Sequence, residues 1–127
     1  MRLPLGGGTP EQMLPEEVQV GGIALDAGRF YWTDSDAGTV SWMPTEGGAV
    51  TTLVTGMDAP QALTLDDVHV YWVDHSKDDY LGAVHRVPTA GGAVEDIADR
   101  DNLGGTMITT DATHVYWSGH RVWRREK

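Results

Sequence analysis

The sequence predicts an all-β chain whose strands form the blades of a β-propeller. The first observation is a Tyr-Trp dipeptide that returns at similar spacing. Its copies are Tyr31-Trp32, Tyr71-Trp72 and Tyr116-Trp117. The second observation is a proline followed by a glycine pair, which alternates with the dipeptide and begins at Pro4, Pro44 and Pro88. A repeat of roughly 40–45 residues is typical of a propeller or another stacked array, and no apolar stripe recurs at helical spacing.

Each repeat is interpreted as four short strands, named A to D from the innermost to the outermost. Strand A is expected at 22–25, 62–65 and 107–110, with a small residue inside each copy. An aspartate follows each copy. Its side chain can accept a hydrogen bond from nearby backbone, which favours a turn into strand B. These aspartates are Asp26, Asp66 and Asp111.

Strand B carries the Tyr-Trp pair and is apolar on both alternating faces, which predicts burial between two neighbouring blades. Strand C is expected at 39–43, 83–87 and 121–124, where the proline and glycine pair end it in a tight turn. Strand D is expected at 49–53, at 93–97 and, in the N-terminal copy, at 9–14. Its centre is polar in every copy, as suits an edge strand.

The pattern resembles the YWTD-type six-bladed β-propeller repeats, in the form common in bacterial repeat proteins, and three repeats are present. Tyr31-Trp32-Thr33-Asp34 is the literal motif, Tyr71-Trp72-Val73-Asp74 differs from it at one position, and the third copy has Ser118-Gly119 after its dipeptide. The resemblance implies blades of four strands and a binding role rather than catalysis. The repeat residues are interpreted as structural: Tyr31, Trp32, Asp34, Tyr71, Trp72, Asp74, Tyr116 and Trp117.

Residues 1–127 are interpreted as a single half-propeller. Rings have typically 4–8 blades, so three units do not close one. A strand D precedes the first full unit, and the last unit supplies strands A, B and C. We therefore expect a homodimer that closes a six-bladed ring through shared blades. The alternatives are a fragment of a longer six-bladed chain and a truncated or designed propeller assembly without a function of its own.

Composition limits the classes of partner and chemistry. The chain has 19 acidic and 9 basic residues and a net charge of −10, which disfavours nucleic acid and anionic lipid surfaces. The chain has no cysteine, which excludes a disulfide framework, thiolate zinc sites and a cysteine nucleophile. No apolar run is long enough to insert into a membrane. No signal peptide is visible at the N-terminus. We therefore expect an extracellular or periplasmic location if a leader has been left out of this sequence, and a cytoplasmic location otherwise.

The candidate ligand-binding residues lie where the repeats differ. The B–C loop of the middle unit, at 75–81, is longer than its counterpart in the first unit, and so is the D–A loop at 99–103. Both kinds of loop lie on the same face of a propeller. The candidates are His75, Lys77, Asp78, Tyr80, Arg100, Asp101 and Gln61, the last at the start of an inner strand. Trp42 and Trp123 are further candidates, as exposed anchors for a partner.

These features predict a non-enzymatic scaffold that binds a protein, peptide or glycan through its loop face, with no catalytic residue, metal or cofactor. The alternative is a metal-dependent hydrolase or lyase of the gluconolactonase-like propeller type. That resemblance implies carboxylate and asparagine ligands at the starts of the inner strands. Here those starts are Gly21, Gln61 and Thr106, and the one asparagine is Asn102, which counts against the enzyme.

Overall fold

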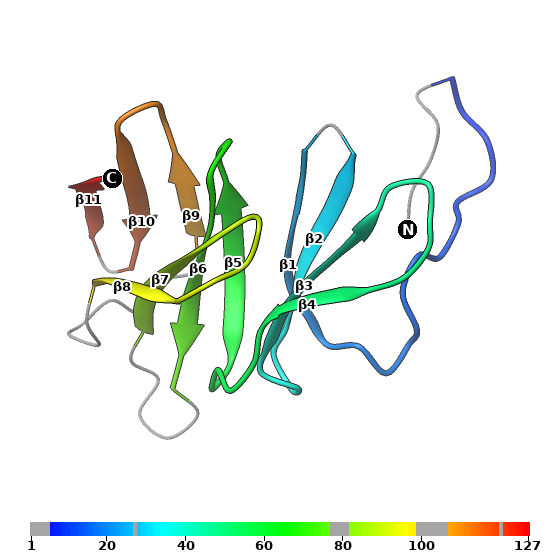
Figure 1. Cartoon of the computed structure of the whole chain (residues 1–127), viewed down its shortest axis with the longest axis horizontal. Helices are drawn as coiled ribbons and strands as arrows, with labels where there is room; N and C mark the ends of the chain where they lie inside the picture. Colours follow the sequence, from blue (N-terminus) through cyan, green and yellow to red (C-terminus); the bar gives the residue numbers. More distant parts are fainter. Residues whose placement is uncertain (1–5, 27, 77–81, 99–106, 120) are drawn as a thin grey trace.

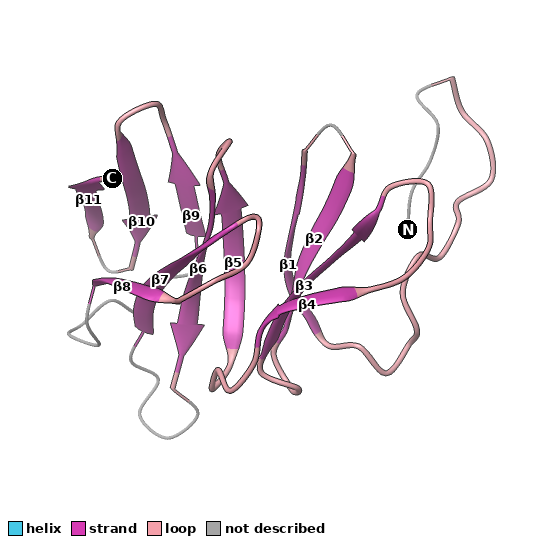
Figure 2. Cartoon of the chain, in the orientation of Figure 1, coloured by secondary structure: helices cyan, strands magenta, loops and turns pink. Residues whose placement is uncertain are grey.

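In the computed structural model, the strands form three antiparallel sheets that stand side by side (Figures 1 and 2). The structure describes residues 6–26, 28–76, 82–98, 107–119 and 121–127. The first blade contains β1 (Val20–Leu25), β2 (Arg29–Asp34), β3 (Thr39–Pro44) and β4 (Thr51–Val54). The second contains β5 (Pro60–Leu65), β6 (His69–His75), β7 (Gly82–Pro88) and β8 (Glu95–Ala98). The third contains β9 (Met107–Thr110), β10 (His114–Ser118) and β11 (Val122–Glu126).

The all-β prediction and the order of strands A to D are confirmed, and the described residues contain no helix. The bounds of β9 are those predicted, whereas β1 and β5 begin before the predicted starts and β4 and β8 begin after them. Residues 9–14, predicted as a strand D, form no strand in the structure, and Glu11 alone makes an isolated bridge. The third blade therefore has three strands among the described residues.

Two apolar clusters join the three blades, and the Tyr-Trp dipeptide contributes to both. Successive side chains of a strand point to opposite faces, so the two rings of one dipeptide face different neighbours. Trp72 packs toward the first blade in a cluster with Tyr31 and Val40, while Tyr71 packs in a second cluster with Val115 of the third blade. Four dipeptide residues thus pack between blades: Tyr31, Tyr71, Trp72 and Trp117.

The first and second blades lie close together near the starts of their inner strands. A Cβ at Gly21 would lie 2.7 Å from the Pro60 carbonyl oxygen, and one at Gly22 would lie 2.9 Å from the Gln61 carbonyl oxygen. Such spacing leaves no room for a side chain. Glycine at both positions is therefore what lets β1 lie against β5, and Thr33 Oγ1 completes the contact by donating to the Gln61 carbonyl at 2.7 Å.

The turns collect at two opposite edges of the blade row. The connections from strand A to strand B lie at the upper edge in Figure 1, here called the upper rim. The turn at 35–38 and the segment 55–59 lie at the lower edge, here called the lower rim. A backbone hydrogen bond of 3.0 Å from the Met57 amide to the Gly38 carbonyl joins these two segments. Among the described residues, no helix is long and apolar enough to cross a membrane.

Candidate functional site

Two aspartates of the Tyr-Trp motifs hold the backbone of the lower rim. Asp34 Oδ1 accepts the amides of Asp36 and Ala37, each at 3.0 Å, and so closes the turn after β2. Asp74 instead accepts the amides of Ala59 at 2.8 Å and Asp58 at 3.2 Å. Both aspartates therefore act as acceptors for backbone amides at this rim. They differ in what they anchor, because Asp74 ties the connection between β4 and β5 to the end of β6.

Gln61 and His75 are the two predicted ligand-binding residues that the structure describes, and it places both at the lower rim. Pro60 pairs with Asp74, so the residues that follow them in β5 and β6 lie at the same end of the second blade. Both are half-buried, and the His75 amide donates to the Ala59 carbonyl at 3.1 Å. The other candidates lie outside the described residues: Lys77, Asp78, Tyr80, Arg100 and Asp101.

The two tryptophans considered as partner anchors differ from each other. Trp42 is half-buried, and the Arg29 guanidinium carbon lies 3.9 Å from the centroid of its ring. A cation over an aromatic face is a favourable internal contact, so the prediction that Trp42 is exposed is wrong. Trp123 is exposed on β11, where it pairs with Trp117.

A repeated contact between an aspartate and a tyrosine holds the upper rim. In each blade, one carboxylate oxygen accepts two backbone amides of the turn and the other accepts the hydroxyl of the Tyr-Trp tyrosine. The hydroxyl distances are 3.2 Å for Tyr31 to Asp26, 3.1 Å for Tyr71 to Asp66 and 2.6 Å for Tyr116 to Asp111. The expected turn role of these aspartates is confirmed. The constant spacing from Asp to Tyr is a signal that could have indicated the hydroxyl contact.

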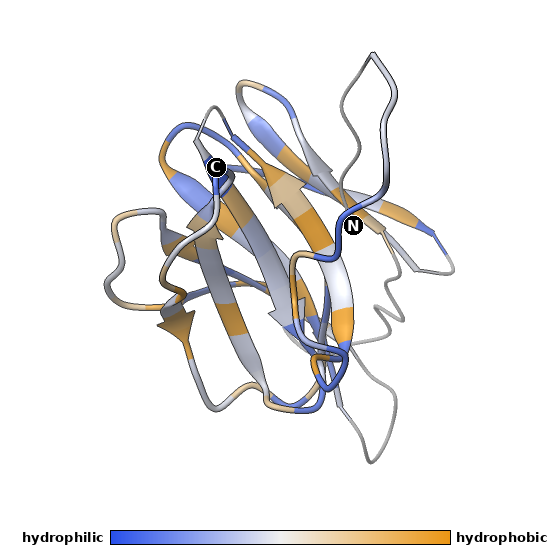
Figure 3. Cartoon of the chain, turned by 90° about the vertical axis from the view of Figure 1, so that its right-hand side faces the viewer, coloured by the Kyte–Doolittle hydropathy of each residue, from blue (hydrophilic) through white to orange (hydrophobic). Residues whose placement is uncertain are grey.

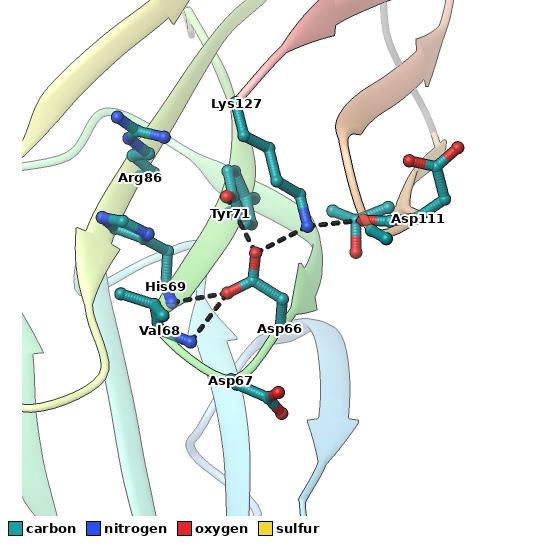
Figure 4. A pocket seen from close by; sticks show the side chains of 10 residues that line it. Asp66, Asp67, Val68, His69, Tyr71, Arg86, Asp111 and Lys127 are labelled. Atoms are coloured by element: carbon teal, nitrogen blue, oxygen red, sulfur yellow. Dashed lines mark hydrogen bonds and ion pairs between the residues drawn. The ribbon is translucent and has the colours of Figure 1, made fainter.

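The upper rim also contains an open hollow of about 740 Å³ between the second and third blades, which the sequence did not indicate (Figure 4). Lys127 crosses it, with Nζ 2.7 Å from Asp66 Oδ2 and within hydrogen-bond distance of the Asp111 carbonyl. His69 and Arg86 line the same hollow. The arrangement places cationic and anionic groups side by side, which suits a polar partner. Among the described residues, no group of three or more His, Cys, Asp or Glu could hold a metal ion.

Asp66 is a partly buried acid of this hollow, and its pKa is strongly shifted. Burial pushes the pKa of its carboxyl upward, but hydrogen bonds from Lys127, the His69 and Val68 amides and the Tyr71 hydroxyl outweigh burial. Together they hold the pKa of Asp66 well below its usual range. In the unfolded state the pKa of aspartate is about 3.9. At acidic pH the folded state therefore binds fewer protons at this carboxyl than the unfolded state does. This contribution to stability is complete above that value and is lost as the pH falls toward the folded pKa.

We expect Asp66→Asn to lower the free energy of unfolding by about 1–3 kcal/mol at neutral pH. The amide oxygen can still accept the two turn amides, but the amide nitrogen would face the Lys127 ammonium and the Tyr71 hydroxyl, both donors. The difference from wild type should shrink between about pH 5 and about pH 2, as measured by urea unfolding. Asp67→Asn, at the exposed neighbouring residue, is the control. Equal pH dependence in wild type and Asp66→Asn would contradict the assignment.

Comparison with known proteins supports the propeller architecture. Protein-family models give no match, and neither do curated protein sequences. Among solved structures, a chain in a nidogen/laminin complex aligns with a TM-score of 0.86 and 25% identity, over 98% of this chain and 51% of that one. The chain thus spans about half the length of that neighbour. This similarity supports a YWTD-type β-propeller.

Two more distant neighbours show the fold alone. Virginiamycin B lyase from Staphylococcus aureus aligns with a TM-score of 0.66 and 14% identity, over 88% of this chain and 42% of that one. The computationally designed Ika4 protein aligns with a TM-score of 0.51 and 10% identity, over 93% of this chain and 99% of that one. The all-β blade arrangement is therefore shared by proteins of different origin, and fold by itself assigns no function.

Proposed function

We propose that this chain is a propeller-type scaffold that binds a protein partner, without chemistry, through its lower rim. The observation that carries the proposal is the similarity to a chain in a nidogen/laminin complex, an assembly of proteins. The geometry of the lower rim supports it. Backbone hydrogen bonds hold the rim, and Gln61 and His75 are half-buried there rather than enclosed in the core. A rigid frame with accessible polar side chains binds with little loss of conformational entropy.

The predicted candidates Lys77, Asp78, Tyr80, Arg100 and Asp101 belong to the same proposal. They combine both signs of charge with an aromatic ring, and such a mixture can make directional contacts with a protein, a peptide or a glycan. Where two copies share one ring, the rim would occur twice, and partners with repeated motifs would gain affinity through avidity. The hydrolase or lyase alternative is not favoured, because the likeness to virginiamycin B lyase, at 14% identity, is a likeness of fold.

A peptide selection tests the proposal with a defined probe. We expect a displayed library of random peptides to yield sequences that bind the immobilised chain. A variant in which Ser35-Asp36-Ala37 replaces residues 75–81 should weaken their binding about tenfold or more. The double variant Gln61→Ala/His75→Ala should weaken it in the same direction, and it serves as the second test if the loop exchange reduces stability. Asp67→Asn, at the upper rim, is the control and should bind as wild type does.

Two results would contradict the proposal. One is peptide binding that survives both lower-rim variants, because the site would then lie elsewhere on the molecule. The other is selection that enriches no peptide above the background of an uncoated surface. The thermal midpoint of each variant, measured by circular dichroism, separates loss of binding from loss of folding.

A further inference from the structure

The blade-to-blade interface occurs twice inside the chain, and each copy has two unlike halves. One half, here called the tyrosine face, contains Tyr31 and Val40 in the first blade. The other half, here called the tryptophan face, contains Leu63, Val70 and Trp72 in the second blade. The second interface repeats this pairing, with the tyrosine face of the second blade against the tryptophan face of the third. Each inner contact thus joins a tyrosine face to a tryptophan face.

The two outer faces of the blade row are the same two halves without a neighbouring blade. On the tryptophan face of the first blade, Ile23 is 59% exposed, whereas its equivalents Leu63 and Ile108 are 7% and 8% exposed. Figure 3 looks onto this end and shows apolar positions along its strands. On the tyrosine face of the third blade, Val122 is 77% exposed, whereas the equivalents of this residue in β3 and β7 are fully buried.

The apolar surface at the third blade is also hollowed. A depression of about 150 Å³ is lined by residues of β9, β10 and β11, among them Met107, Tyr116 and Val122. At the first blade, a depression of about 290 Å³ lies between the N-terminal segment and the residues Ile23 and Phe30. Exposed apolar surfaces of this kind mark sites of association. Because one end offers a tyrosine face and the other a tryptophan face, the ends complement each other and not themselves.

The outer strands show the same complementarity. Strands β3 and β7 each pair with a fourth strand, whereas β11 has only β10 as a neighbour among the described residues. The N-terminal segment has the backbone of the turn that leads into such a fourth strand. Gly7 and Gly8 have φ of 93° and 142°, Gly47 and Gly48 have 94° and 136°, and the corresponding pair of the second blade has 90° and 139°. Residues 11–14 therefore follow a turn of the same conformation as the turns before β4 and β8, yet they form no strand.

The register inside the second blade specifies how these two segments would pair. There Arg86 pairs with Glu95, and Arg86 Nη2 lies 2.8 Å from Glu95 Oε2. By the pairing of β10 with β11, Arg124 is the equivalent of Arg86. By its position after the glycine pair, Glu11 is the equivalent of Glu95. Opposite charges therefore stand at matching positions of β11 and of residues 11–14.

We propose that a second copy of this chain covers both open faces, so that β11 of each copy pairs with residues 11–14 of the other. Arg124 of one copy then forms an ion pair with Glu11 of the partner, as Arg86 does with Glu95. Interfaces between unlike faces form a closed ring when the rotation between units allows it. Two copies supply two such interfaces. This chain aligns with 51% of the chain in the nidogen/laminin complex, which is therefore about twice as long. This inference goes beyond the binding role of the lower rim and does not depend on it.

The first test is the mass of the full chain in solution and its response to charge reversal. We expect twice the 13.8 kDa of one chain by sedimentation velocity. Glu11→Arg and Arg124→Glu should each raise the dimer dissociation constant about tenfold, since each change acts at two contacts per ring. The double variant Glu11→Arg/Arg124→Glu should return to within about threefold of wild type, because it restores the opposite charges.

Residues on the open face provide the second test. Val122→Asp should convert the dimer to a monomer, whereas Val68→Asp, at a residue 58% exposed in an upper-rim turn, should leave the mass unchanged. The chain has no cysteine, so Leu14→Cys/Val122→Cys reports the strand pairing directly. These positions correspond to Ala98 and Val84, which are paired in the second blade. Mild oxidation should give a covalent species of two chains, and each single cysteine variant should not give it at the same yield.

Three outcomes would overturn the proposal: a folded monomer at every concentration, a ladder of open oligomers, or a disulfide that forms within one chain. A monomer or an intrachain bond would mean that the open faces belong to another partner. Open oligomers would mean that the faces associate without closing a ring. Each of these outcomes leaves peptide binding at the lower rim to be judged by its own test.

Discussion

Replacing Trp72 by alanine should lower the free energy of unfolding by about 3–5 kcal/mol, the usual cost of deleting a buried aromatic side chain. Trp72 is fully buried between the first and second blades, where it packs with Tyr31, Leu63 and Val87. The neighbouring residues cannot collapse into the space, because they are fixed in two different sheets. Urea unfolding followed by circular dichroism measures the change.

Two controls separate the packing of Trp72 from its polar group. Among the described residues, the indole nitrogen of Trp72 is buried without a hydrogen-bond partner. Trp72→Phe removes this costly group while keeping much of the apolar volume, so we expect a loss below about 2 kcal/mol. Val68→Ala, at an exposed turn residue, should change stability by less than about 0.5 kcal/mol. A similar small effect for Trp72→Ala would show that this tryptophan does not join the two blades.

Replacing Gly38 by alanine should lower the free energy of unfolding by about 2–5 kcal/mol, because two independent costs add. Gly38 has a φ of 69°, a conformation that residues with a Cβ rarely adopt. A Cβ there would also lie 2.2 Å from the Met57 carbonyl oxygen. Because the atoms that the methyl group would meet belong to the Met57 backbone, the lower rim would have to open to admit it.

Two other glycines separate these costs by urea unfolding. Gly56 has a φ of 77° and no atom within 4 Å of a built Cβ, so Gly56→Ala should show only the conformational cost of about 1–2 kcal/mol. Gly28 has neither constraint, so Gly28→Ala should be neutral or slightly stabilising. Equal losses for Gly38→Ala and Gly56→Ala would mean that the contact with Met57 does not constrain the rim.

The structure and the sequence agree best on the interior of each blade. The Tyr-Trp spacing indicated strand B, and the structure places all three dipeptides in central strands. The regular geometry of a strand explains this agreement, because successive side chains point to opposite faces in any strand. The bounds of strand A were less accurate at β1 and β5. Strand ends depend on contacts with adjacent loops, which the periodic pattern does not encode.

The candidate site could be predicted only in part. The comparison of repeats named His75, in a longer loop, and Gln61, at the start of an inner strand, and the structure places both at the lower rim. It did not indicate Lys127, whose ammonium lies 2.7 Å from Asp66 in a different blade. It also assigned exposure to Trp42, which is covered by Arg29. The first contact joins two blades, whereas the second lies within the first blade. Both depend on how far a long side chain reaches, which the repeat pattern does not encode.

The sequence by itself determined the repeating unit, the order of its strands and the two apolar faces of strand B. Those properties follow from local rules, since the alternation of side chains, proline and glycine at turns and polar residues at an edge strand act within one repeat. Only the tertiary structure decided which faces meet inside the chain and which remain open. Ile23 and Leu63 are equivalent in sequence, but one is exposed and the other buried. The difference arises from the neighbour that each face has, because burial is a property of the packed blades rather than of the repeat.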